Sequence, residues 1–150
     1  TLCHLDGDYL PLRDAKVSVL DRGFIFGDGV YEVVPVYGGR LFGFDEHMAR
    51  LDRSLAELRI PNPHASEGWR TIAERLVCEA PPTDTQAVYI QVTRGVARRD
   101  HPFPNPAPRP TVVMTARRID AAKALLPRCR VLALTTSAER AVPRSYSEAT

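Results

Sequence analysis

The chain has 150 residues, of which 44% are hydrophobic and 25% charged, and these proportions are typical of one globular domain with a core of ordinary size. Its formal net charge is +2 and its arginines are dispersed, so the composition gives no electrostatic reason to expect a nucleic-acid partner. No apolar run approaches the roughly 18 residues of a membrane span, and no secretory signal is visible. Because the three cysteines and four histidines are scattered, we expect a cytoplasmic protein with reduced thiols and no metal site.

The first part of the chain predicts strands. Residues 15–20 alternate apolar and polar side chains and indicate a first strand. Residues 30–37 are rich in β-branched and aromatic residues and predict a second strand, which a Gly-Gly turn reverses into residues 40–44. Because Pro35 has no N–H to donate, we expect this second strand to lie at a sheet edge or to carry a bulge.

Two amphipathic helices are predicted next. Asp45 is a suitable N-cap for the first helix, which should end near Ile60 because two prolines follow. The second helix should span about residues 66–80. The buried positions are those that recur at helical spacing, namely Met48, Leu51, Leu55 and Leu58 in the first helix and Trp69, Ile72, Leu76 and Val77 in the second.

The last predictable elements are two strands, at residues 86–94 and 111–117, separated by a proline-rich loop at residues 101–110. Strands with two interposed helices predict an α+β fold, with a largely antiparallel sheet and both helices on one face. We expect one domain over residues 1–118, followed at 119–150 by a linker and the truncated or aberrant start of a second domain.

A glycine-punctuated segment, DRGFIFGDG at residues 21–29, allows positive φ angles and close backbone approach. On composition alone, a plain tight connection between strands explains it equally well. The longer run from Asp21 to Ile60 resembles the N-terminal domain of class IV, fold-type IV, pyridoxal-phosphate aminotransferases. The resemblance extends from about Asp6 to Thr115, through VYIQVTRGVARRDHPFP. Within that family, which includes branched-chain aminotransferases and aminodeoxychorismate lyase, the chain is most similar to the D-amino acid aminotransferase branch.

Arg50, in the motif EHMARL, is the candidate cofactor-binding residue. Arginine offers phosphate a planar fork of donors. Spacing alone favours a surface arginine that pairs with Glu46 one turn earlier. The resemblance implies instead that Arg50 holds the phosphate of pyridoxal 5′-phosphate.

Three further residues are candidates for binding the substrate carboxylate. Arg99 and His101 lie two apart in RRDHPFP, so in extended backbone they face the same side. The resemblance implies that this pair traps the substrate carboxylate across a dimer interface and that Tyr31 donates a hydrogen bond to the same group. Branched-chain enzymes generally lack the pair. The alternatives are a solvated loop for the pair and a sheet-surface aromatic for Tyr31.

The catalytic lysine is missing from the expected place. The family forms its Schiff base on a lysine in a motif that follows these strands, whereas the corresponding residues read SAERAVPRSYSEAT. The chain's two lysines, Lys16 and Lys123, lie outside that motif. We therefore expect a family that transfers amino groups between D-amino acids and 2-oxo acids as a homodimer, but a chain that is inactive alone. The tail is compatible with an out-of-frame reading of the lysine motif.

Two other functions remain open on the sequence. One is another class IV reaction, either branched-chain transamination or the aminodeoxychorismate elimination. The other is a non-enzymatic domain that binds a partner.

Overall fold

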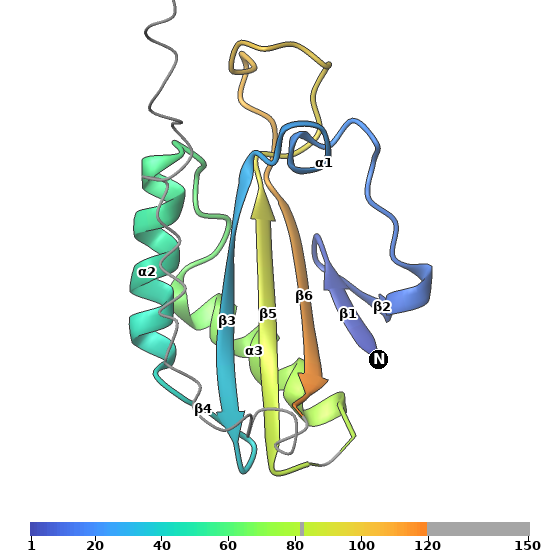
Figure 1. The fold of residues 1–150 in the computed structure, drawn as a ribbon, viewed down its shortest axis with the longest axis vertical. Coiled ribbons are helices and arrows are strands. Elements are labelled where there is room, and N and C mark those ends of the chain that lie inside the picture. Colours follow the sequence, from blue (N-terminus) through green and yellow to red (C-terminus); the bar gives the residue numbers. More distant parts are fainter. Residues whose placement is uncertain (82, 120–150) are drawn as a thin grey trace, which may run out of the picture. The chain divides into compact units, whose positions relative to one another are not determined.

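The computed structural model describes residues 1–81 and 83–119 (Figure 1). Its elements, in chain order, are β1 (Leu2–Leu5), β2 (Asp8–Pro11), a 3-10 helix η1 (Leu12–Asp14), α1 (Arg22–Phe26), β3 (Gly29–Tyr37), β4 (Arg40–Leu41), α2 (Phe44–Glu57), α3 (Ser66–Glu79), β5 (Thr85–Thr93) and β6 (Thr111–Arg118). The linker and second-domain start expected after residue 118 lie, from residue 120 onward, outside the described residues.

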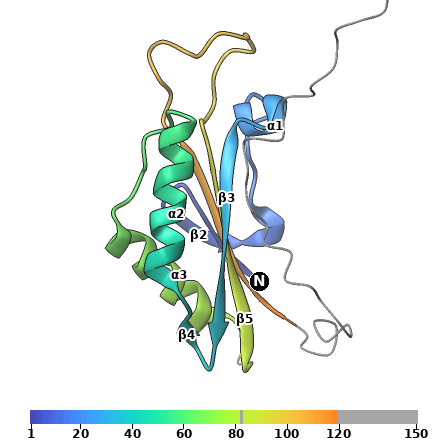
Figure 2. The ribbon, with the colours of Figure 1, turned by 60° about the vertical axis from the view of Figure 1, so that its left-hand side comes forward.

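The strands form one six-stranded sheet in the order β2-β1-β6-β5-β3-β4, and every neighbouring pair is antiparallel. Figure 2 shows α2 and α3 on the same face of this sheet, with α1 at the end where β3 begins. The predicted α+β fold, with a largely antiparallel sheet and two helices on one face, is therefore confirmed.

The core lies between this face and the two helices. Alternate residues of the strands point inward, as the period of two requires, and the single tryptophan, Trp69, is fully buried among them. The Nε1 of Trp69 donates to Asn62 Oδ1 at 3.1 Å, so its polar atom is satisfied. The core residues include Val34, Val36, Met48, Leu51, Leu55, Ile72, Leu76, Val88, Ile90, Val92 and Met114. Leu58, expected inside, is only partly buried at the edge of this cluster.

Pro35 occupies the position that its chemistry allows. It lies in β3 opposite Ala87 of β5, and its carbonyl accepts from Phe42 N at 2.9 Å on the other side of the strand. Since the N–H and C=O of one strand residue point to the same side, the missing donor also falls on this outer side. Within the described residues, β4 pairs there only with Val36 and Tyr37. This agrees with the edge position expected of a strand proline.

Two expectations about local structure are wrong. Residues 15–20 form no strand, and their alternation has no neighbouring strand to pair with in the described part of the chain. The N-cap of α2 is Gly43 in the left-handed conformation, with φ 57°, and Asp45 lies in the first turn instead. An element was also missed: β1 and β2 form a hairpin through Asp6 and Gly7.

The other face of the sheet keeps apolar side chains accessible. Tyr31, Val33 and Tyr37 project from β3 on the side away from the helices, at 37%, 37% and 53% exposure. Phe24 of α1 is 76% exposed. No helix among the described residues is long and apolar enough to cross a bilayer.

Candidate functional site

Arg50 projects from α2 toward Glu32 of β3, and the two side chains form a bidentate ion pair. Arg50 Nε donates to Glu32 Oε1 at 2.6 Å, and Nη2 donates to Oε2 at 2.7 Å. The carboxylate is buried, with a side-chain exposure of 2%, whereas the arginine side chain is 44% exposed. The expected alternative partner, Glu46, is therefore not the residue that holds Arg50. Glu32 fixes one edge of the guanidinium and leaves the other edge toward solvent.

His47 completes this cluster from one turn earlier on α2. Its Nδ1 lies 2.9 Å from Glu32 Oε2 and 3.3 Å from Arg50 Nη2. The hydrogen bond to Glu32 raises the pKa of Arg50, burial acts in the opposite direction, and the charges of Glu32 and Tyr31 add to the rise. The Nη1 of Arg50 makes no hydrogen bond to any part of the chain that the structure describes. A fixed cation with free donors is suited to an oxyanion such as phosphate.

Tyr31 lies next to Glu32 in β3, so its side chain points to the opposite face of the sheet. Its ring stacks on Tyr89 of β5, with centroids 6.1 Å apart. Burial, and the neighbouring Tyr31, raise the pKa of Tyr89, whose hydroxyl donates to Gln91. The Tyr31 phenol and the Arg50 guanidinium therefore lie on opposite faces of the sheet at β3.

Arg99 and His101 lie on the long loop between β5 and β6, and both contact Phe26 of α1. The Phe26 ring centroid is 5.8 Å from the Arg99 guanidinium carbon and 5.8 Å from the His101 ring. The two side chains thus gather on one side of the loop, as their two-residue spacing predicts. Arg99 and His101 lie against Phe26, whereas Tyr31 lies against Tyr89.

Two buried arginines share one carboxylate beneath this loop. We call Arg22, Asp28 and Arg94 the Asp28 cluster. Asp28 Oδ2 accepts from Arg22 Nε at 2.8 Å and from Arg94 Nε at 2.7 Å, and Oδ1 accepts from Arg94 Nη2 at 3.0 Å. The three side chains are 5%, 11% and 7% exposed in chain order. Arg94 also donates to the carbonyls of Leu58 and Arg59 just after α2, which ties the end of β5 to that helix end.

Asp21 anchors α1 to the sheet. Its Oδ1 accepts from Gly23 N at 2.8 Å as the N-cap, and its Oδ2 accepts from the hydroxyls of Thr93 and Thr111 at 3.0 and 2.7 Å. The approach is so close that a Cβ on Gly23 would stand 2.3 Å from Thr93 Cγ2. The glycine-punctuated segment therefore includes a close backbone contact, as its composition allows.

The Asp28 carboxyl should titrate below the ordinary aspartate pKa of about 3.9. Burial raises the pKa of Asp28, but the hydrogen bonds and charges of Arg94 and Arg22 outweigh it and the net shift is downward. A lowered pKa means that its stabilising contribution is complete above the unfolded value and is lost as pH falls through the folded one. The 13Cγ chemical shift of Asp28, followed from pH 6 to pH 2, should show the low midpoint, and a midpoint at or above 3.9 would contradict the ion cluster.

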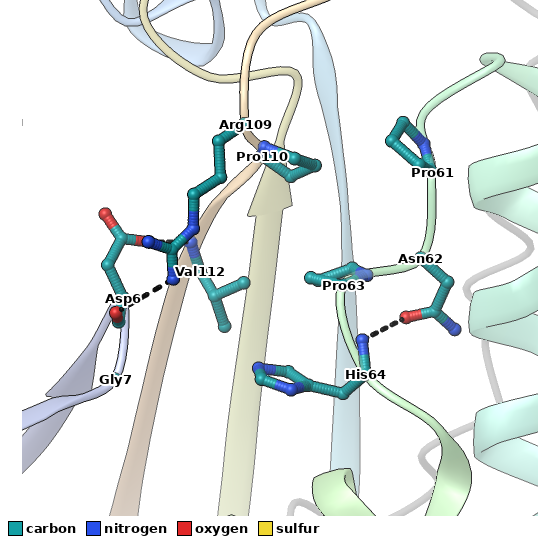
Figure 3. Close-up of a pocket in the computed structure, with 9 residues that line it drawn as sticks. All are labelled: Asp6, Gly7, Pro61, Asn62, Pro63, His64, Arg109, Pro110 and Val112. Atoms are coloured by element: carbon teal, nitrogen blue, oxygen red, sulfur yellow. Dashed lines mark hydrogen bonds between the residues drawn. The ribbon is translucent and has the colours of Figure 1, made fainter.

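A pocket of about 230 Å³ lies elsewhere, between the β1–β2 turn, the α2–α3 loop and the residues before β6 (Figure 3). Its lining residues are Asp6, Gly7, Pro61, Asn62, Pro63, His64, Arg109, Pro110 and Val112. Arg109 reaches across to donate to the Asp6 carbonyl at 3.3 Å. Burial, and then the Arg109 charge, lower the pKa of His64. Tyr31, Arg50, Arg99 and His101 do not line this pocket.

Sequence reasoning missed Glu32, His47 and the Asp28 cluster. A buried glutamate in an otherwise β-branched strand was the available signal for Glu32, because charged residues are rarely fully buried unless paired. Its partners lie on a different element, which local spacing cannot show. Among the described residues, no group of three or more His, Cys, Asp or Glu is arranged to hold a metal.

Known proteins are similar to this chain in sequence and in fold. The family model described as amino-transferase class IV matches residues 29–149. A D-alanine aminotransferase of Staphylococcus aureus is 40% identical over 116 residues, which are 77% of this chain and 41% of that protein. The branched-chain amino acid aminotransferase of Escherichia coli matches with a TM-score of 0.71 at 19% identity, over 79% of this chain and 40% of that one. The 4-amino-4-deoxychorismate lyase of Pseudomonas aeruginosa matches with a TM-score of 0.63 at 28% identity, over 80% and 41%. The chain spans about two fifths of the length of these relatives.

Proposed function

Since the chain belongs to the class IV aminotransferase family, we propose that it is the N-terminal domain of a transaminase that moves an amino group between a D-amino acid and a 2-oxo acid. The observation that carries the proposal is the presence of two separate donor groups: Arg50, a half-exposed arginine fixed on α2, and the side chains of Arg99 and His101, which both lie against Phe26 on the β5–β6 loop. The first fits a phosphate and the second fits a carboxylate. The sequence relatives named D-alanine aminotransferase support the D-amino acid branch.

The cofactor of the family is pyridoxal phosphate, and the residues present fit its phosphate. Glu32 holds the Arg50 guanidinium by Nε and Nη2, so Nη1 remains to donate to phosphate oxygens. Pyridoxal phosphate, when bound, supplies the electron sink that eases removal of a proton from the α-carbon of an amino acid. This chain's contribution is to anchor and orient that group, not to move the proton.

The substrate end is assigned to Arg99, His101 and Tyr31. A guanidinium and an imidazole that share one side of a loop offer a carboxylate two convergent donors. The Tyr31 phenol, on the exposed face of β3, is the third donor. Branched-chain transamination and aminodeoxychorismate elimination remain the alternatives, and the Arg99–His101 pair argues against both.

The chain alone should not transaminate. Proton transfer in this family needs a lysine, and the sequence offers only Lys16, which is exposed between η1 and α1, and Lys123, which lies outside the described residues. Incubation with pyridoxal phosphate followed by borohydride should leave no stoichiometric lysine adduct.

We also propose that the exposed apolar face of β3 and Phe24 of α1 are covered by a second copy or by the rest of the protein. A chain that stays strictly monomeric in solution would contradict coverage of this face by a second copy.

Replacing Arg50 with alanine should abolish phosphate recognition. We expect the unaltered chain to bind pyridoxamine 5′-phosphate about tenfold more tightly than pyridoxamine, because a charge-assisted hydrogen bond at a half-exposed site is worth about 1.5 kcal/mol. Arg50→Ala should erase that difference. Arg53→Ala, an exposed arginine on the same helix, is the matched control and should keep it. Amide chemical-shift titration of the three chains measures all of these affinities, and an equal loss in both variants would indicate nonspecific attraction.

The substrate branch can be tested by supplying the missing half. A chimera joins residues 1–118 to the C-terminal part of the Staphylococcus aureus relative. Transamination of D-alanine with a 2-oxo acid, and none of L-leucine, is the expected outcome. Arg99→Gln and His101→Gln in the chimera should raise KM for D-alanine more than they lower kcat. Preference for L-leucine would favour the branched-chain alternative.

A further inference from the structure

The peptide between Arg99 and His101 is held from below by a buried guanidinium. Arg22 Nη1 donates to the carbonyl of Asp100 at 2.9 Å. Asp100 is the residue between the two, and Arg22 precedes it by 78 positions, so the bond joins α1 to the loop. The rest of the β5–β6 loop near this point is exposed. A contact made by a side chain that is only 5% exposed therefore fixes an otherwise accessible segment.

Phe26, one turn after Arg22 on α1, places the two side chains themselves. Its ring lies 4.7 Å from the Arg22 guanidinium carbon, 5.8 Å from that of Arg99 and 5.8 Å from the His101 ring. Guanidinium groups are attracted to the face of an aromatic ring at such distances. One aromatic side chain is thus shared by the buried arginine and by both residues of the pair.

Asp28 fixes the direction in which Arg22 points. The Arg22 Nε donates to Asp28 Oδ2, which leaves Nη1 directed at the Asp100 carbonyl. Arg94 holds the same carboxylate in a bidentate pair and is itself bound to the carbonyls after α2. The chain of contacts therefore runs from α2 and β5, through Asp28, to Arg22 and the loop. Lysine could not replace Arg22, because one ammonium group cannot span both partners.

We propose that Arg22, oriented by Asp28 and assisted by Phe26, is a positioning residue for the Arg99–His101 pair: it sets the loop so that both side chains present their donors on one side. The conformational part of this proposal stands on the contacts alone. Its consequence for substrate rests on the proposed function, in which that pair binds a carboxylate.

Arg22→Gln and Arg22→Lys test the proposal on the 150-residue chain. In both variants Asp28 keeps its bidentate partner Arg94, so we expect the fold to persist. Arg13→Gln, at an exposed arginine of η1, is the matched control. Two measurements report the loop: the ring-proton shifts of His101, which the Phe26 ring current displaces, and the rate of tryptic cleavage after Arg98 and Arg99.

The expected result is that both variants move the His101 signals toward free-histidine values and speed cleavage about tenfold, the scale set by loss of one charge-assisted hydrogen bond. Arg13→Gln should change neither. Unchanged signals and cleavage in folded Arg22 variants would overturn the proposal. Should Arg22→Gln not fold, Arg22→Lys, which retains the charge, decides alone.

A ligand titration separates positioning from general damage. D-alanine is the carboxylate probe, followed at His101, and pyridoxamine 5′-phosphate is the probe for Arg50. Arg22→Gln should weaken D-alanine about tenfold and leave the phosphate probe within twofold, whereas equal weakening of both would overturn a positioning role. If D-alanine leaves His101 of the unaltered chain unperturbed, the carboxylate assignment of the proposed function fails. The positioning of the loop is then still decided by the His101 signals and the cleavage rate.

Discussion

Replacing Asp28 with alanine should destabilise the chain by about 3–5 kcal/mol. The substitution leaves Arg22 and Arg94 with buried positive charges and no counter-ion, and removing one partner of a buried ion pair costs about this much. Both arginine side chains are less than a tenth exposed. Asp28→Asn keeps the shape and some hydrogen bonds, so its cost should be smaller than that of alanine but of the same sign.

Urea unfolding at pH 7 measures this cost, with the fluorescence of the buried and only tryptophan, Trp69, as the signal. Asp14→Ala is the matched control, since the Arg13–Asp14 pair is wide at 3.7 Å and largely exposed. It should leave the urea midpoint nearly unchanged. If Asp28→Ala shifted the urea midpoint no more than Asp14→Ala does, the Asp28 cluster would not stabilise the fold.

Gly95→Ala should be about as damaging, for a steric reason. Gly95 follows β5 with φ 100°, a conformation that side chains rarely allow. A Cβ there would also stand 1.9 Å from the carbonyl oxygen of Arg109, which is backbone and cannot move aside cheaply. Gly95 also accepts a hydrogen bond from Arg22 N at 3.0 Å, so a shift would disturb α1 as well. We expect a loss of about 3 kcal/mol or more.

Gly38→Ala is the comparison at a glycine with positive φ and no clash. Gly38 has a positive φ of 53°, and nothing lies within 4 Å of where its Cβ would be. Its substitution should cost only the strain of the left-handed conformation, about 1–2 kcal/mol. A larger loss of stability in Gly95→Ala than in Gly38→Ala is expected, both from the contact with the Arg109 carbonyl oxygen and from the less favourable φ of 100°. Equal midpoints would mean that the backbone at Gly95 and Arg109 moves apart enough to admit a methyl group.

The spacing of apolar residues was sufficient to locate a helix that buries one of its faces. The stripes through Leu51, Leu55 and Trp69 located α2 and α3 to within a few residues, because a period near 3.6 needs no knowledge of the partner. The same reasoning misassigned residues 15–20, where Val17 and Val19 alternate with polar residues but remain exposed. Alternation predicts a strand only if a neighbouring strand is available to pair with it.

The hairpin β1–β2 was missed for the complementary reason. Its Asp6-Gly7 turn is a strong hairpin signal, yet the flanking strands are four residues each and include polar His4 and Asp8. What stabilises β1 is its pairing with β6, where Cys3 lies opposite Thr115. Such long-range pairing is invisible to a local window.

In the candidate site too, some residues could be predicted from the local sequence and others depend on long-range packing. Family motif and chemistry singled out Arg50, Arg99 and His101, and the structure brings the last two together. The residues that hold them could not be found in this way. Glu32 precedes Arg50 by 18 positions and Arg22 precedes Asp100 by 78, so these partners are chosen by the packing of α2 and α1 on the sheet.

The order of strands in the sheet also determines when the sheet can be completed while the chain is being synthesised. β1 sits between β2 and β6, so the residue opposite Cys3 is made 112 positions later. At roughly 5–20 residues per second, the ribosome needs about 6–22 seconds to deliver it. In that interval β3 and β5 can already pair and receive α2, whereas the β1–β2 hairpin has no strand to join. We expect the hairpin to dock last, which makes the N-terminal residues the part most accessible to chaperones and proteases while the chain is being made.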